Sequence, residues 1–235
     1  MHERRCRWTL LVVWIIWSLV GWYFHEPWRD EAQAWLVARY STDLSELLIR
    51  AASEATGPFY YLLLWPFAQI FPGHFLPFLY LVSWTGTLLA MGFILLSDLF
   101  PLRIALLVAF GYLFGYEYAV VARLYGWGSF FLLWGIWADK RDRTTLSSAV
   151  LALCASLQLN FCFGILIWVA YRVFTGTPWK RYLLPLVGIA AMLGFLHWGR
   201  ELFPWGTWTY PKGAVYVFST LTVPFLPLAG MGGWA

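Results

Sequence analysis

Two adjacent carboxylates are the first residues in this chain whose type and placement suit chemistry. Asp30 and Glu31 lie in the stretch 25–35 (HEPWRDEAQAW), just beyond a charge-free apolar run. A carboxylate at a bilayer surface is partly desolvated, which makes it a better base. The alternative is a helix start, with Asp30 as the N-cap, Gln33 reaching back and Glu31 favoured by the helix dipole. Both interpretations can hold together, because a cap fixes a side chain in place.

An isolated arginine follows about ninety residues later. Arg123 and Glu117 interrupt an otherwise uncharged apolar run from Ile104 to Trp137. A charge in such a run is costly unless it reaches an interface, a partner or a water-filled cavity. We interpret Arg123 as a ligand for a lipid phosphate in the outer headgroup layer. The alternatives are an ion pair between Arg123 and Glu117, or snorkelling of Arg123 to the membrane surface.

The remaining candidates are weaker. Arg200 opens an aromatic-rich stretch at 199–212, and we expect it to join the phosphate site, although an aromatic belt also explains the stretch. Cys6, Cys154 and Cys162 are too scattered for a disulfide framework or a metal cluster. The pattern therefore predicts no cofactor and no metal ligands, and it leaves a divalent metal open.

The composition indicates what kind of elements must position these residues. The chain has 235 residues, of which 61% are hydrophobic, 21% aromatic and only 12% charged. An ordinary soluble domain is roughly 25% charged. This excludes a disordered protein, a soluble globular enzyme and a nucleic-acid-binding module. The fold class is therefore all-α, a polytopic transmembrane helical bundle in a single domain, 1–235.

The apolar segments predict about seven or eight membrane spans. The first, Trp8–Phe24, follows a basic run and lacks a small-residue cleavage site, so it predicts a retained anchor instead of a signal peptide. The residues 146–174 could also form one long span, although Gln158 would then lie deep in lipid. The other predicted spans are Phe75–Ser97, Ile104–Val121, Leu124–Ala138, Leu146–Asn160, Phe161–Phe174, Tyr182–Trp198 and Ala214–Gly230.

The basic residues support an orientation for these spans. With the N-terminus in the cytoplasm and alternating direction, ten of the sixteen Lys and Arg residues fall on the cytoplasmic side. They are Arg4, Arg5, Arg7, Arg103, Lys140, Arg141, Arg143, Arg172, Lys180 and Arg181. The prediction is a multi-pass protein of the cell (inner) membrane, whose partners include the lipid bilayer and no nucleic acid.

The residues 25–74 form a long first extracytoplasmic loop with its own helices. Asp43 and Glu46 have capping-box spacing, and an apolar period follows from Leu44 to Ala55. This predicts an amphipathic helix that lies on a membrane. The pair Gly57-Pro58 ends it, and Phe59–Phe71 is apolar but too short to span, which predicts an interfacial or partly inserted helix.

Four features occur in an order that belongs to a known superfamily. They are the N-terminal anchor and the motifs 28–35 (WRDEAQAW), 57–61 (GPFYY) and 122–125 (ARLY). In these features roughly residues 8–175 resemble the N-terminal half of integral-membrane C-type glycosyltransferases, the superfamily of protein O-mannosyltransferases and aminoarabinose transferases. Bacterial proteins of the dolichyl-phosphate-mannose–protein mannosyltransferase type are the most similar group. The chain departs from the pattern at Thr56-Gly57-Pro58, where relatives commonly carry His or Lys before the proline.

The resemblance implies an enzyme that moves a sugar from a polyprenyl-phosphate donor to an acceptor hydroxyl, with inversion, on the extracytoplasmic face. The acceptor would be a protein, a lipid or a glycan. Asp30 would be the general base, and Glu31 would orient groups or bind the acceptor. Arg123, with Tyr125 beside it, would lie near the donor phosphate and stabilise the leaving anion.

Several further expectations accompany this interpretation. We expect Arg29 and Glu117 to support the site. Full-length relatives have more spans and often a soluble domain. We therefore expect this chain to be the N-terminal piece of a longer enzyme, and we expect the piece to be inactive alone. The competing functions are a transporter or flippase for lipid-linked sugars, and a scaffold with a degenerate site. A transporter usually carries its charges near the bilayer midplane and in two matching halves, and the sequence has neither feature.

Overall fold

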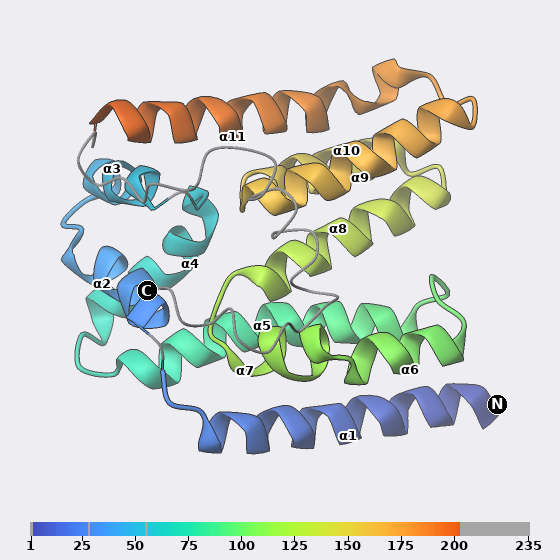
Figure 1. The fold of residues 1–235 in the computed structure, drawn as a ribbon, viewed down its shortest axis with the longest axis horizontal. Helices are drawn as coiled ribbons and strands as arrows, with labels where there is room; N and C mark the ends of the chain where they lie inside the picture. The colour runs from blue at the N-terminus through green and yellow to red at the C-terminus, as the bar shows by residue number, and fades with distance from the viewer. Residues whose placement is uncertain (1, 28, 55, 203–235) are drawn as a thin grey trace, which may run out of the picture.

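The computed structural model describes residues 2–27, 29–54 and 56–202, and these residues are helical, without a strand. The all-α prediction is therefore confirmed over this part of the chain. Figure 1 shows the long helices stacked in chain order, from α1 along one edge to α11 along the other. The elements are α1 (His2–Phe24), α2 (Arg29–Tyr40), α3 (Leu44–Ser53), α4 (Pro58–Ile70), α5 (Phe75–Leu96), α6 (Leu102–Phe110), η1 (Leu113–Glu117), α7 (Tyr118–Val120), α8 (Tyr125–Lys140), α9 (Thr144–Ala155), α10 (Leu159–Phe174), η2 (Trp179–Tyr182) and α11 (Leu183–Leu202).

The described residues contain fewer candidate spans than the sequence predicted. Three helical segments are long and apolar enough to cross a membrane: α1, α5 and Trp179–Gly199. A fourth is the bent pair Leu102–Phe110 and Leu113–Val120, if its 56° bend is a break within one span. The helices α9 and α10 are apolar but shorter. The count is thus three or four, and the predicted span 214–230 lies outside the described residues.

One predicted span is interrupted, and the two segments predicted within 146–174 are separate helices. The segment 104–121 is broken into α6, the π-helical turn η1 and the short α7. The segment 146–174 is two helices, α9 and α10, separated by a turn at Ser156–Gln158. The single long span is therefore wrong, and Gln158 lies in the turn between the two helices.

Tryptophans of α1 stabilise the broken segment. A helix break leaves carbonyl oxygens without their usual partners, which is costly in apolar surroundings. The indole N–H groups of Trp14, Trp17 and Trp22 donate to the carbonyl oxygens of Phe114, Gly115 and Ala119, at 2.8, 2.6 and 2.8 Å. These tryptophans thus tie α1 to η1 and α7, in addition to any role at a membrane interface.

The helices α5 and α8 cross closely at a glycine. A Cβ added at Gly126 would lie 2.1 Å from Thr87 Oγ1 and 2.4 Å from the Thr87 backbone nitrogen. The Thr87 hydroxyl also donates to the carbonyl oxygen of Tyr118, at 2.6 Å. Only glycine fits this approach, which fixes the start of α8 and the connection that precedes it.

The two ends of the stack differ in composition. The N-terminus and the connections that follow α5, α8 and α10 lie at one end, which we call the basic end (right in Figure 1). Its contacts join these segments, for example Arg7 to the carbonyl oxygens of Leu95 and Phe100 and Arg141 to Asp98. The basic connections thus share one end, as alternating helix direction requires.

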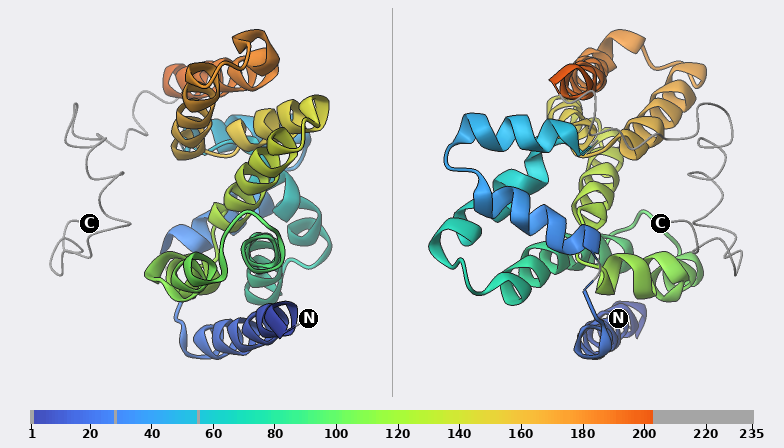
Figure 2. Two further views of the ribbon diagram at one scale, coloured as in Figure 1. Left: turned by 90° about the vertical axis from the view of Figure 1, so that its right-hand side faces the viewer. Right: turned by 60° about the vertical axis from the view of Figure 1, so that its left-hand side comes forward.

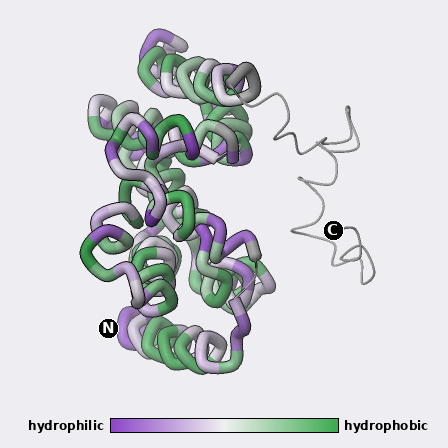
Figure 3. The backbone as a smooth tube through the Cα atoms, turned by 90° about the vertical axis from the view of Figure 1, so that its left-hand side faces the viewer, coloured by the Kyte–Doolittle hydropathy of each residue, from purple (hydrophilic) through white to green (hydrophobic). Residues whose placement is uncertain are grey.

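The helices α2, α3 and α4 form a layer across the opposite end, the site end, between α1 and α11. Figure 2 (right) shows this layer in front of the stack. Figure 3, viewed from the same end, shows hydrophilic stretches of backbone among hydrophobic ones. The prediction of separate helices in the residues 25–74 is therefore confirmed.

The amphipathic helix α3 has the predicted N-terminus but covers protein. Asp43 is its N-cap and accepts from the Glu46 backbone N–H at 2.9 Å, while Glu46 accepts in return from Thr42. Its apolar face is buried, with Leu47 and Ala51 at 0% exposure, against α4 and α11. The expectation that this face lies on a membrane is therefore wrong.

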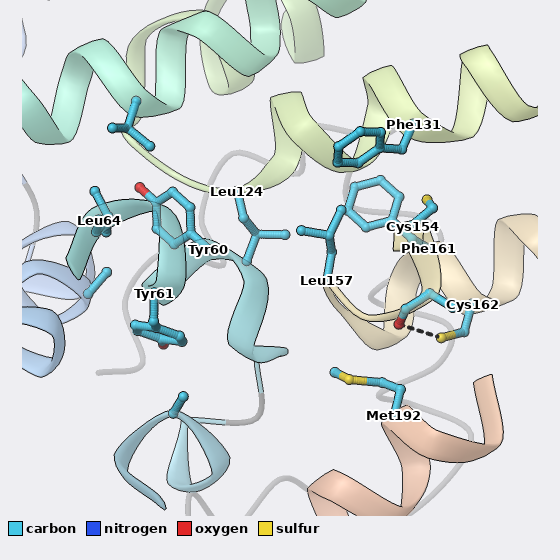
Figure 4. Close-up of a cluster of buried hydrophobic side chains, with 14 of the residues drawn as sticks. Tyr60, Tyr61, Leu64, Leu124, Phe131, Cys154, Leu157, Phe161, Cys162 and Met192 are labelled. Atoms are coloured by element: carbon cyan, nitrogen blue, oxygen red, sulfur yellow. Dashed lines mark hydrogen bonds between the residues drawn. The ribbon is translucent and has the colours of Figure 1, made fainter. Parts of the chain in front are cut away.

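The layer is anchored to the bundle at the start of α4. The backbone N–H of Gly57 donates to the carbonyl oxygen of Leu157 at 2.7 Å, and a Cβ at Gly57 would lie 1.6 Å from the Ser156 carbonyl oxygen. Figure 4 shows Leu124 and Leu157 facing each other beside this contact, with Tyr60 and Tyr61 pointing away from α4 in different directions.

Candidate functional site

An ion pair between distant segments is the centre of the candidate site. Arg123, in the connection between α7 and α8, donates to Asp30 in the first turn of α2. The two side chains are partly open to solvent, at 28% exposure for Arg123 and 45% for Asp30. The structure thus brings together the carboxylate and the arginine that the sequence analysis singled out separately.

Glu31 lies next to this pair but is closed to solvent. Its side chain is 0% exposed, accepts from the Ala122 backbone N–H, and has one oxygen 2.9 Å from His25 Nε2. Two consecutive residues of α2, Asp30 and Glu31, therefore hold two consecutive residues of the α7–α8 connection: Asp30 holds Arg123, and Glu31 holds Ala122. Since Glu31 cannot reach a substrate without rearrangement, its contacts indicate a positioning role for it.

Tyr60 of α4 holds the same peptide from the other side. Its buried hydroxyl donates to the Ala122 carbonyl oxygen at 3.1 Å and lies 2.6 Å from Ser83 Oγ of α5. The Ala122 backbone N–H and carbonyl are thus both bonded to buried side chains. This fixes the residue before Arg123 and thereby the direction in which the guanidinium leaves the chain.

Two local interpretations from the sequence are wrong. The helix α2 begins at Arg29, so Asp30 lies inside the first turn and is not the N-cap, and Gln33 bonds to Glu54 instead of reaching back. Glu117 accepts from the Tyr112 hydroxyl at 2.9 Å, whereas Arg123 pairs with Asp30. The carboxylate near in sequence is thus not the partner of Arg123.

The remaining predicted residues lie at different places. Tyr125 is the first residue of α8, and the Arg123 guanidinium carbon is 6.0 Å from its ring centroid. Glu117 lies in η1, outside the contacts of the Asp30–Arg123 pair. Arg29 begins α2, and Arg200 lies in the last turn of α11, whose residue Gly199 packs on Ala52 of α3. The side chains of Arg29 and Arg200 are not among the described ones.

A third carboxyl group beside the pair was missed. Glu54, at the end of α3, accepts from Gln33 Nε2 with both oxygens, at 2.7 Å each. Gln33 is one helical turn after Asp30 on the same face of α2. Burial raises the pKa of Glu54 above its usual value of 4.5, the Gln33 hydrogen bonds and the Arg123 charge oppose this, and the negative charge of Asp30 adds to it.

The missed residues occur in motifs that the sequence analysis had noted. His25 and Gln33 are in the 25–35 stretch and Tyr60 in 57–61, but nothing in either motif tells that they contact Glu31, Glu54 or Ala122. Glu54 belongs to the polar face of an amphipathic helix, and such faces are usually solvated. The sequence therefore shows the types of these residues, but it does not show which of them lie close together in space.

No group of three or more His, Cys, Asp or Glu side chains that could hold a metal ion occurs among the described residues. No known family model, curated protein or solved structure matches the chain. The chemistry of the site is therefore argued from its own geometry. An exposed carboxylate beside a fixed guanidinium can accept a proton from one group while an anion is stabilised next to it.

Proposed function

We propose that the protein is a membrane glycosyltransferase that moves a sugar from a polyprenyl-phosphate donor to an acceptor hydroxyl on the extracytoplasmic face, with inversion. The observation that carries the proposal is the exposed Asp30–Arg123 pair, held at one end of an apolar bundle by the buried contacts of Glu31 and Tyr60 with Ala122. A site of this kind lies where a lipid-borne headgroup and a water-borne acceptor can meet.

The chemistry follows from the two charges. Asp30 takes the proton of the acceptor hydroxyl, whose oxygen forms a bond to the anomeric carbon of the sugar. The bond from that carbon to the phosphate oxygen breaks, and its electron pair leaves with the lipid phosphate. Arg123 stabilises the developing phosphate charge, with Tyr125 beside it. Attack opposite the leaving phosphate inverts the anomeric centre.

The apolar surface next to the site supports a lipid donor. An exposed apolar face lies along the last turns of α1. It is formed by Ile16, Leu19, Val20, Tyr23 and Phe24. The helix α1 leads directly into His25, which contacts Glu31, so a polyprenyl chain on this face would bring its phosphate toward Arg123.

The proposal includes an orientation in the membrane. The basic end is cytoplasmic, the α2–α4 layer is extracytoplasmic, and the cell (inner) membrane surrounds the stack. In this orientation the shorter helices α8, α9 and α10 run between the same two ends and complete the proposed seven-to-eight-span bundle, although α9, at 12 residues, is shorter than a full span. The positive-inside bias of the connections supports this orientation.

The experiment compares Asp30→Asn with Glu46→Gln in proteoliposomes supplied with a polyprenyl-phosphate sugar. Glu46 is a matched control, because it is a carboxylate paired with an arginine, Arg50, in the same α2–α4 layer. We expect Asp30→Asn to lower transfer by about 10²–10⁴-fold, the usual contribution of a general base. Glu46→Gln should leave transfer unchanged.

The same assay separates the competing functions. A wild-type protein that carries the donor across the bilayer and leaves it chemically intact is a transporter, and this result overturns the proposal. Transfer that survives Asp30→Asn at the wild-type rate removes Asp30 as the base. The Arg123→Gln variant should lower the turnover number more than it raises the KM for the acceptor, because the guanidinium acts on the leaving group.

A further inference from the structure

Two tyrosines flank the connection that carries Arg123. Tyr118 begins the short helix α7 and Tyr125 begins α8, so the residues 121–124 lie between them. The centroids of the two tyrosine rings are 5.1 Å apart, with 30° between the ring planes. The Arg123 guanidinium carbon is 6.0 Å from the centroid of the Tyr125 ring. The tyrosine pair, Tyr118 and Tyr125, therefore continues directly from the charged site, and the proposed mechanism leaves Tyr118 without a role.

The helix α5 fixes the backbone on both sides of this connection. The Thr87 hydroxyl donates to the Tyr118 carbonyl oxygen at 2.6 Å. The Thr87 backbone nitrogen lies so close to Gly126, the residue after Tyr125, that a Cβ added there would be 2.4 Å from it. A ligand site whose backbone is held in advance loses less conformational freedom on binding. A single residue of α5 thus preorganises both tyrosines.

The tyrosine pair stays open to a ligand, unlike its neighbours in the chain. Tyr118 and Tyr125 are partly exposed, whereas Val120 and Leu124 are buried. Within the described part of the chain the Tyr118 hydroxyl makes no hydrogen bond, and it is not enclosed by protein. A phenol hydroxyl can both donate and accept a hydrogen bond. The pair thus offers ring surface and a hydroxyl group to a ligand that binds next to Arg123.

A sugar ring is the ligand that suits this surface. A pyranose has C–H groups on its faces and hydroxyl groups around its rim, which match an aromatic ring and a phenol hydroxyl. In the donor the anomeric carbon is bonded to a phosphate oxygen, so a phosphate held by Arg123 places the sugar beside the guanidinium. Asp30 has to face the acceptor, which attacks opposite the phosphate. The tyrosine pair, which lies beside Arg123, is therefore placed to contact the sugar ring.

We propose that the tyrosine pair is the subsite for the sugar ring of the donor, with Tyr125 next to the phosphate and Tyr118 farther along the ring. This inference rests on the proposed function, since it names the part of the same site that recognises the sugar. Arg123 then binds the phosphate, which every lipid phosphate has, whereas Tyr118 contacts only the sugar. Tyr118 is thus a specificity-determining residue that favours a pyranose with an uncovered C–H face.

The test compares lipids that differ only in the sugar. One kind is a polyprenyl-phosphate hexose, used as the mannose and the glucose form. The other is a polyprenyl methyl phosphate of the same chain length, a diester with the same single charge. Affinities are measured for the purified full chain in nanodiscs. The wild type should bind at least one hexose lipid about tenfold more tightly than the methyl phosphate, because only the hexose has a ring for the tyrosine pair.

Substitutions of Tyr118 should change the affinity for the hexose lipid alone. Tyr118→Ala removes the ring and the hydroxyl and should lower this affinity by about tenfold. Tyr118→Phe keeps the ring and should lower it by about threefold. The affinity for the methyl phosphate should stay at the wild-type value in both variants. Because Tyr118→Phe preserves the packing of the ring, it tests the same contact even if Tyr118→Ala does not fold.

A second tyrosine pair in the same broken segment provides the matched control. The rings of Tyr112 and Tyr116 have centroids 5.9 Å apart, and both side chains are exposed. The Tyr112 hydroxyl donates to Glu117, outside the contacts of the Asp30–Arg123 pair. Tyr116→Ala should therefore leave the affinities for both kinds of lipid unchanged.

The outcomes separate this inference from the proposed function. Equal affinity of the wild type for both kinds of lipid, or an equal loss for both in the Tyr118 variants, overturns the sugar subsite. Binding with the expected differences but no sugar transfer overturns the glycosyltransferase and keeps the subsite. In transfer assays Tyr118→Ala should raise the KM for the donor by about tenfold and leave the turnover number within about twofold, since it removes binding that the ground and transition states share. A fall in the turnover number with an unchanged KM contradicts this role of Tyr118.

Discussion

The two ends of this molecule each contain a buried carboxylate, and the two carboxylates have different neighbours. At the basic end Asp139 of α8 is 1% exposed and pairs with Arg172 at 2.8 Å. It also accepts from the Trp168 indole at 3.1 Å and the Tyr182 hydroxyl at 3.0 Å. These donors come from α10 and η2, so a single carboxylate ties three elements together.

At the site end Glu31 makes comparable buried contacts, but another charged pair lies directly beside it. Asp30 lies in the same helix turn as Glu31 and is 45% exposed, paired with Arg123. The charge of Asp139 is enclosed by its hydrogen-bond partners, whereas the charges of Asp30 and Arg123 remain accessible to a ligand. The comparison teaches that the buried contacts of Glu31 hold the start of α2 in place, so that the adjacent Asp30 is fixed in position while its carboxylate stays accessible to solvent.

The largest expected effect separates the two ends by stability. Asp139→Ala leaves Arg172 without its carboxylate partner, and such a loss costs about 3 kcal/mol. Asp30→Ala removes a partly exposed pair and should cost less than about 1 kcal/mol. Thermal unfolding in detergent, followed by tryptophan fluorescence, measures both changes.

Activity should change in the opposite order. Sugar transfer per folded molecule should be close to wild type in Asp139→Ala and nearly lost in Asp30→Ala. If the two variants lose stability equally and keep equal transfer, the two ends do not differ in the way proposed here.

Much of the fold could be predicted because membrane helices leave strong local signals. The apolar periods placed the helices α5, α8, α10 and α11 within a few residues, and the basic residues placed their connections at one end. The N-cap Asp43 was predictable as well, since a cap acts within one turn. The π-helical turn was not, because it depends on tryptophan donors from α1, about a hundred residues away.

The residue types of the candidate site could be predicted from the sequence, but the contacts between those residues could not. Asp30 and Arg123 stood out because almost everything near them is apolar, but their pairing joins positions 93 residues apart. Sequence offered Glu117 as a nearer partner, and only the fold decides against it. Glu54 and Asp139 were overlooked for a related reason, since Glu54 lies on the polar face of an amphipathic helix and Asp139 beside a charged stretch, and a solvated role is the ordinary one in both places.

The second prediction tests the buried half of the site. Glu31→Gln removes a charge that holds the Ala122 N–H and faces His25, so we expect a loss of about 2 kcal/mol in stability. Because Arg123 is then less well fixed, the turnover number should fall by more than tenfold in the folded fraction, with the acceptor KM unchanged. A loss of stability without any change in turnover would make Glu31 a purely structural residue.

The third prediction concerns the Tyr60 hydroxyl, which holds the Ala122 carbonyl. Tyr60→Phe keeps the ring in the core and removes the bonds to Ala122 and Ser83, which should cost about 1 kcal/mol and several-fold in transfer. Tyr112→Phe is the matched control, because its hydroxyl donates to Glu117, outside the contacts of the Asp30–Arg123 pair. Equal effects of the two substitutions on transfer would contradict the idea that the Ala122 peptide positions Arg123.

The smallest expected effect belongs to an exposed pair at the basic end. Asp98 contacts Arg141 at 2.9 Å, and its own backbone N–H and Arg141 hold its pKa below the usual 3.8. A carboxyl group whose pKa is lowered in the folded protein stabilises the fold at any pH above its ordinary pKa. That contribution is lost as the pH falls through the lowered pKa. Asp98→Asn should therefore unfold at nearly the wild-type temperature at neutral pH, with a difference that disappears in acid and at high salt. Arg141 keeps its place over the Trp137 ring, 4.2 Å from the centroid, which further limits the effect. A large, salt-independent loss would mean that exposed charges at the basic end hold the stack as firmly as Asp139 does, and the contrast between enclosed and open charge would fail there.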